Sequence, residues 1–94
     1  MALEITREAA DLLKESLTLA GIDLATGGAR LRAARGLGGG SDVQVELAPR
    51  PAPGEEILER DGVRVFLDPT VAAVYPDAVL TVEPQHDTIV VRPR

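Results

Sequence analysis

The stretch LRAARGLGGGSDV, residues 31–43, has a run of glycines between two segments with the pattern of strands. Before the glycines, apolar and basic residues alternate over residues 29–35, which predicts a half-buried strand with a basic outer face. After them, Val43, Val45 and Leu47 alternate with polar residues and predict a second strand. The glycines between the two strands permit positive φ angles and close approach of the backbone. The stretch therefore predicts a glycine-rich loop held between two strands.

A second informative stretch is ILERDGVRVFLDP, residues 57–69. The pair Asp61 and Gly62 between two apolar runs is typical of a tight hairpin turn. In the second run, Val63, Val65 and Leu67 alternate with Arg64 and Phe66, which is the pattern of a strand. This is the clearest hairpin that the sequence predicts.

The N-terminal part of the chain predicts an amphipathic helix. Thr6 can accept a hydrogen bond from a free N–H of the first turn, Glu8 suits the positive end of the helix dipole, and Gly21 can adopt the left-handed conformation that ends a helix. The apolar residues recur on one stripe, at Ala9, Leu12, Leu13, Leu17 and Ala20. We expect a packing helix that has no site of its own.

The remaining segments complete a β-rich pattern. Residues 49–56 form an exposed proline-rich loop, residues 69–75 are expected to form a short helix, and residues 78–83 and 88–92 are expected to be strands joined by a turn. The sequence lacks the regular alternation of strands and helices that a doubly wound parallel sheet needs. It predicts one compact α+β domain, residues 1–94, a sandwich or barrel of about six short strands with one N-terminal amphipathic helix and one short helix.

Composition excludes several kinds of function. A net charge of −5 disfavours nucleic acid, whose binding depends on basic groups that contact phosphates. The chain has no cysteine, so these residues can form neither a disulfide nor a thiolate site for zinc or an iron-sulfur cluster. No apolar stretch is long enough to span a membrane, and the first residues do not resemble a signal peptide. We therefore expect a cytoplasmic protein without membrane contacts.

Four segments span nearly the whole chain: they are, in order, ITREAADLLKESL, LRAARGLGGGSD, ILERDGVRVFLDP and TIVVRPR. This order of segments resembles the A-type iron-sulfur carrier family, the HesB/IscA-like domain. The resemblance implies a compact β-rich fold that often pairs as dimers or tetramers. It also implies an iron-sulfur cluster on three cysteines, one in a GCSG loop and two in a C-terminal CGC motif.

The cysteines of that family are absent from this chain. Aligned without a gap, the position of the first one falls on Gly40, and the sequence reaches Arg94 without a CGC motif. The loop at the family's cluster position comprises Gly38, Gly39, Gly40, Ser41 and Asp42. We therefore expect no cofactor in a cysteine-less relative of the carriers.

Two other kinds of binding remain open at the sequence level. Successive glycine N–H groups can form a nest for a small anion, which Arg30, Arg32 and Arg35 would help to hold. Asp42 and His86 are weak candidates for a metal site, because spacing alone does not show that they converge. The only histidine does not belong to a recognisable catalytic arrangement, so we expect no enzymatic activity.

Three functions follow from these observations. The first is a non-catalytic protein that acts through self-association or a protein partner, in connection with iron-sulfur cluster assembly. The second is a binding module for a small anion or a metal ion that uses the loop of residues 36–41. The third is cluster assembly in which a partner supplies all the thiolates.

Overall fold

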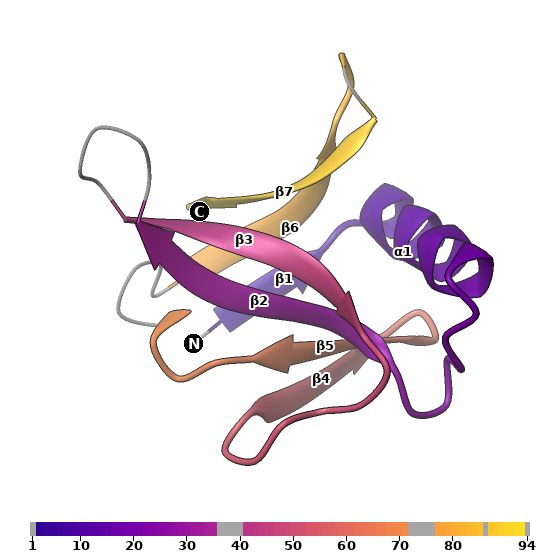
Figure 1. Cartoon of the computed structure of the whole chain (residues 1–94). Helices are drawn as coiled ribbons and strands as arrows, with labels where there is room; N and C mark the ends of the chain where they lie inside the picture. The colour runs from indigo at the N-terminus through magenta and orange to yellow at the C-terminus, as the bar shows by residue number, and fades with distance from the viewer. Residues whose placement is uncertain (1, 36–40, 72–76, 86, 94) are drawn as a thin grey trace.

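The computed structural model describes residues 2–35, 41–71, 77–85 and 87–93, which form seven strands and one long helix (Figure 1). In chain order the elements are β1 Ala2–Ile5, α1 Arg7–Leu19, β2 Gly28–Arg35, β3 Ser41–Ala48, β4 Glu56–Arg60, β5 Val63–Leu67, β6 Asp77–Glu83 and β7 Thr88–Pro93. The expected strand-rich α+β fold is confirmed.

The strands form two sheets. One has the order β1-β6-β7 and the other the order β3-β2-β5-β4. β1 runs parallel to β6 and β2 runs parallel to β5, whereas the other neighbours are antiparallel. The edge strands β3 and β7 lie side by side, and α1 packs against both sheets at one end (Figure 1).

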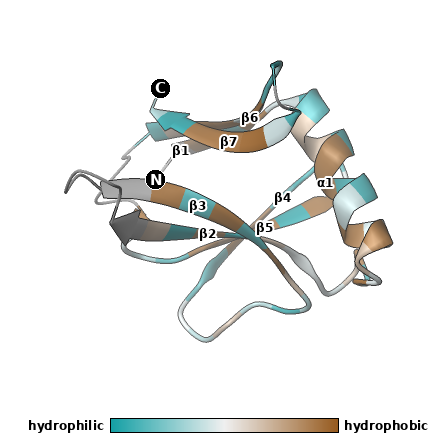
Figure 2. Cartoon of the chain, turned by 45° about the horizontal axis from the view of Figure 1, so that its top comes forward, coloured by the Kyte–Doolittle hydropathy of each residue, from teal (hydrophilic) through white to brown (hydrophobic). Residues whose placement is uncertain are grey.

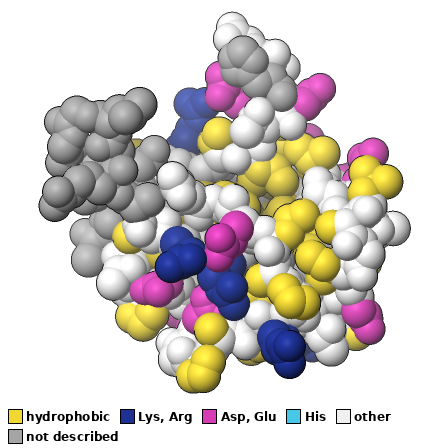
Figure 3. Space-filling view, in the orientation of Figure 1, with side chains coloured by type: hydrophobic (Ala, Val, Ile, Leu, Met, Phe, Trp, Pro, Cys, Tyr) yellow, Lys and Arg dark blue, Asp and Glu magenta, His cyan; other side chains and the backbone are white. Residues whose placement is uncertain are grey.

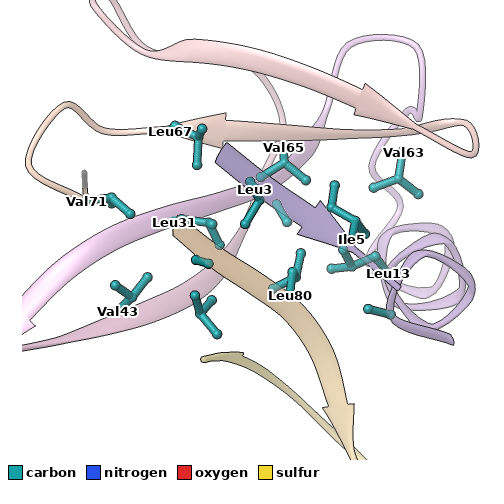
Figure 4. Packing of buried hydrophobic residues seen from close by; sticks show 14 of the residues in the cluster. Leu3, Ile5, Leu13, Leu31, Val43, Val63, Val65, Leu67, Val71 and Leu80 are labelled. Carbon is teal, nitrogen blue, oxygen red and sulfur yellow. The ribbon is translucent and has the colours of Figure 1, made fainter. Parts of the chain in front are cut away.

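The core lies between the sheets and under the helix. Leu3, Leu31, Val65 and Leu80 come from four different strands and are almost completely buried (Figure 4). Along β3, hydrophobic and hydrophilic positions alternate, as the sequence predicts for a half-buried strand (Figure 2). Full burial of one such aliphatic side chain contributes about 1.5–3 kcal/mol, so this core holds the two sheets together.

Local signals define both ends of α1. The Thr6 hydroxyl accepts a hydrogen bond from Ala9 N at 3.2 Å, which confirms the predicted N-cap. At the other end Gly21 has a φ of 72°, and the amides of Gly21 and Ile22 donate to the carbonyls of Thr18 and Leu17. This is the Schellman pattern, in which a left-handed glycine satisfies the last carbonyls of a helix.

The predicted hairpin joins β4 and β5. Asp61 and Gly62 have φ angles of 51° and 81°, as a tight two-residue turn between antiparallel strands requires. Val65 and Phe66 alternate along β5 and so lie on opposite faces of the strand, yet both are completely buried. β5 lies inside its sheet and is covered on both faces, so period-two alternation does not mark an exposed side here.

Two segments of the chain, β1 and residues 69–75, need comment against the sequence prediction. β1 was not predicted; it exists because Leu3 and Ile5 pair with β6 in register with Ala78 and Leu80. The expected short helix over residues 69–75 falls mostly outside the described residues. Its start is a capped turn, in which the Asp68 carboxylate accepts hydrogen bonds from the Thr70 amide at 2.8 Å and hydroxyl at 2.6 Å.

Across the part of the chain that the structure describes, no helix has the length and apolar character needed to cross a membrane.

Candidate functional site

The glycine-rich stretch connects β2 to β3, so the two strands that the sequence placed on either side of it are direct neighbours. Gly38, Gly39 and Gly40 lie outside the described residues. Immediately after them, Ser41 and Asp42 begin β3, and their backbones pair with those of Arg35 and Ala34. The base of the predicted loop is therefore an antiparallel ladder.

Arg30 is held by a network of acceptors on the outer face of β2. Its Nε donates to Glu55 Oε2 at 2.6 Å, and its Nη2 donates to Glu55 Oε1 at 3.1 Å and to the carbonyl of Arg50 at 3.1 Å. A second carboxylate, that of Glu46, lies 3.6 Å from Nη1. The guanidinium thus makes a bidentate pair with one carboxylate and lies beside another, a strong and geometrically specific arrangement.

Glu55 links this network to the proline-rich loop. Its side chain is only 5% exposed, and its Oε1 also accepts a hydrogen bond from the amide of Ala52 at 2.6 Å. The hydrogen bond from Arg30 is the main cause of a lowered pKa of Glu55, with a smaller contribution from the Ala52 amide. Arg30 and Glu55 therefore fix residues 50–55 against β2.

The other two arginines of the predicted anion patch are Arg32, whose side chain is described, and Arg35, for which only the backbone pairing is described. Arg32 is 60% exposed at its side chain and lies 3.4 Å from Glu46 Oε1. Arg35 pairs with Ser41 through the backbone. The structure thus joins Arg30 and Arg32 through one shared carboxylate, and anion binding by Arg30, Arg32 and Arg35 stays a prediction.

The predicted weak metal ligands are not brought together in the described residues. His86 falls outside them, and for Asp42 only the position in β3 is described. Within the described ranges, no group of three histidine, cysteine, aspartate or glutamate side chains has a geometry that could hold a metal ion.

Glu55 is the residue that sequence reasoning missed. It follows Gly54 in a loop with no periodicity, and its partner Arg30 is in a strand that precedes it by an intervening strand and loop. The only available signal was an acidic pair, Glu55 and Glu56, after the prolines. That signal does not identify which carboxylate points inward.

Comparisons with known proteins were made by sequence and by structure. No protein-family model and no curated protein matches this sequence. SufA of Escherichia coli, a protein involved in the biosynthesis of iron-sulfur clusters, superposes with a TM-score of 0.74 over 97% of this chain and 79% of its own, at 17% identity. The chain has the fold of the A-type carriers.

Two further structures have this carrier fold. IscA, determined with a [2Fe-2S] cluster, gives a TM-score of 0.71 at 14% identity, over 96% of this chain and 81% of its own. A protein from Aquifex aeolicus, determined by NMR in solution, gives 0.70 at 20% identity and covers the whole of this chain and 93% of its own. The structural match thus supports the resemblance that the order of the sequence segments indicated.

The donor set of this chain does not fit an iron-sulfur cluster of the kind that IscA holds. Such clusters are bound by cysteine thiolates, with histidine as an occasional replacement. These 94 residues contain no cysteine and one histidine. These 94 residues therefore have the carrier fold but offer no thiolate that could bind a cluster.

Proposed function

We propose that this chain is a cytoplasmic, non-catalytic accessory protein that acts through protein contacts in iron-sulfur cluster assembly and does not itself carry a cluster. One observation carries the proposal: the fold of IscA and SufA combined with a sequence that has no cysteine. A scaffold of this kind can still present the surfaces through which carriers meet other proteins. It lacks the thiolates that would hold the cargo.

A non-catalytic role agrees with the chemistry of the described side chains. The bidentate pair of Arg30 and Glu55 is engaged in holding a loop. Glu55 has a lowered pKa, and a carboxylate with a lowered pKa is a poor general base near neutral pH. Protein contact is therefore the activity that remains for this scaffold.

The first test of the proposal is anaerobic reconstitution with iron and sulfide, followed by desalting and by measurement of visible absorption, iron and sulfide per chain. We expect no stoichiometric retention, because these residues offer no thiolate. A cysteine-containing carrier such as IscA, treated in parallel, is the matched control and should retain its cluster. Stoichiometric iron and sulfide on the cysteine-less chain would overturn the central inference.

The second test is pairwise binding between this chain and purified iron-sulfur assembly proteins, together with sedimentation of the chain alone. We expect a saturable complex with at least one assembly protein. A chain that sediments as a monomer and binds none of them over the micromolar range would contradict an accessory role in this process.

A further inference from the structure

The two sheets separate at the end of the sandwich where α1 lies, and this leaves apolar side chains at the surface. Along the inward face of β3, exposure increases from Val43, which is buried, through Val45 to Leu47, which is 37% exposed. Ile89 on β7 and Val82 on β6 are likewise only partly buried against the core. The core therefore continues into an open surface at this end.

This open surface is called the α1 groove here. It consists of two adjoining hollows of about 680 Å³ and 330 Å³ that share Leu12 and Asp87. The residues that line it include Glu8, Leu12 and Glu15 of α1, Leu47 of β3, Asp87 of the β6–β7 turn and Ile89 of β7. Figure 3 shows hydrophobic side chains gathered on this face between β7 and α1. The floor of the groove is apolar.

Acidic side chains form the rim of the α1 groove. Glu8, Glu15 and Asp87 line it, and none of the described residues that line either hollow is a lysine or an arginine. These three carboxylates form no ion pair with any cation in the described ranges. The groove thus combines an apolar floor with negative charge that the described part of the molecule does not neutralise.

The spacing of the rim charges matches a helix as the occupant. Glu8, Leu12 and Glu15 lie at i, i+4 and i+7 on α1, so the two carboxylates are about 10 Å apart along its axis with an apolar residue between them. A second helix aligned with α1 can place cations at the same two-turn spacing and apolar residues toward Leu12 and Leu47. Helix binding in a groove uses this combination of contacts.

The charge of the rim also excludes other occupants. A second copy of this chain docked by a two-fold axis through the groove would bring the same acidic rims together, and like charges across an interface cost binding free energy. An anionic lipid surface or a nucleic acid would be repelled for the same reason. The chemistry favours a cationic partner.

We propose that the α1 groove binds an amphipathic helix of a partner protein, a helix with leucine-like residues on one face and lysine or arginine on the flanks. This inference rests on the proposed function, because it assigns the surface and the partner chemistry through which the accessory protein acts. Apolar contact with Leu12, Leu47 and Ile89 supplies most of the affinity. The acidic rim supplies the orientation and the rate of association.

The test uses a synthetic helical peptide of about four turns with leucines at i, i+3, i+4 and i+7 and arginines on both flanks. The comparison peptide has glutamate in place of every arginine. Binding to the ¹⁵N-labelled chain is followed by NMR. We expect saturable binding of the arginine peptide with amide shifts concentrated around Leu12, Leu47 and Ile89, weaker binding at higher salt, and no binding of the glutamate peptide.

Two variant pairs separate a specific groove from general attraction to an acidic protein. Glu15→Lys in the groove is matched by Glu56→Lys on β4, since both residues are exposed and both changes alter the net charge equally. Leu47→Ser is matched by Ile57→Ser, which removes an apolar side chain that is 45% exposed on the same β4 strand. We expect each groove variant to weaken binding about tenfold and each β4 variant to change it less than about twofold.

If the groove variant and its β4 control weakened peptide binding equally, the proposed groove site would be wrong. Amide shifts centred on another face, or no binding of the arginine peptide, would also contradict it. Melting temperatures of all four variants establish that each one is folded. A negative peptide result alongside a complex with an assembly protein refutes this inference alone. Retention of a cluster by the chain refutes the proposed function and leaves the peptide result intact.

Discussion

Arg30 on the outer face of β2 and the carboxylates of the α1 groove are charges in opposite surroundings. The Arg30 guanidinium donates to Glu55 and to a backbone carbonyl and lies beside Glu46, whereas Glu8 and Glu15 form no ion pair with a described cation. The first arrangement fixes a loop, and the second leaves charge beside apolar surface. The ion pairs of Arg30 thus stabilise the fold, whereas the carboxylates beside apolar surface are the reason for which we propose the α1 groove as a binding surface.

Burial follows the same division between the two regions. Phe66 is in register with Arg30 and with Ile57, so it lies on the outer face of its sheet, yet it is completely buried. Leu47 is on the inward face of β3, yet more than a third of it is exposed. The outer face of the sheet is thus covered at Phe66, and its inward face is open at Leu47. The exposure of a side chain therefore depends on which elements pack over it, and not only on the face of the strand that it occupies.

The largest expected difference between the two regions is in the free energy of unfolding that is lost when one apolar side chain is removed from each. We expect Phe66→Ala to lower the free energy of unfolding by about 3–5 kcal/mol, because it leaves a cavity on a covered face. Leu47→Ala should cost less than about 1 kcal/mol, because solvent already reaches that side chain. Urea denaturation measures both. Equal losses would show that the two regions are packed alike.

A smaller effect should follow from changing the charge on the Arg30 face. Glu55→Gln removes the charge of the carboxylate that pairs with Arg30 through two hydrogen bonds, and we expect a loss of about 1–3 kcal/mol in the free energy of unfolding. Glu56→Gln, at the exposed neighbouring residue, is the control and should stay within about 0.5 kcal/mol of the parent. Indistinguishable variants would mean that the ion pair contributes nothing measurable to stability.

The smallest expected effect is the loss of stability at acidic pH that the protonation of Glu55 causes. Because the pKa of Glu55 is lowered in the folded state, its contribution is present above the pKa of the unfolded chain and is lost as pH falls through the folded pKa. Between about pH 5 and pH 3, the parent should therefore lose stability more steeply than Glu55→Gln. Urea curves at a series of pH values give the two slopes. Parallel slopes would contradict an ionised, paired Glu55.

Features fixed by local chemistry could be predicted from the sequence. The helix between Thr6 and Gly21 has a cap at each end and an apolar stripe between them, and the turn at Asp61 and Gly62 needs only its two residues. The strand-rich class follows from alternation along β2 and β3. Each of these signals acts over a few neighbouring residues.

Features that depend on distant segments could not be predicted. β1 is a four-residue strand that exists through parallel pairing with β6, and the burial of Phe66 depends on what covers a central strand. Of the candidate site, the strands that flank the glycines were predicted, but the carboxylate that binds Arg30 was not. A contact between two distant segments does not alter the hydrophobic periodicity of either one, so the pattern along the sequence does not reveal it.

The parallel pairing of β1 with β6 also sets the order in which the molecule can be completed. Leu3 and Ile5 find their partners, Ala78 and Leu80, only near the other end of the sequence. During synthesis from the N-terminus, these two residues stay without their strand partners until β6 has left the ribosome. Such long-range contacts slow folding, so we expect the sheet of β1, β6 and β7 to close late, whereas the caps of α1 need only residues near it in the sequence.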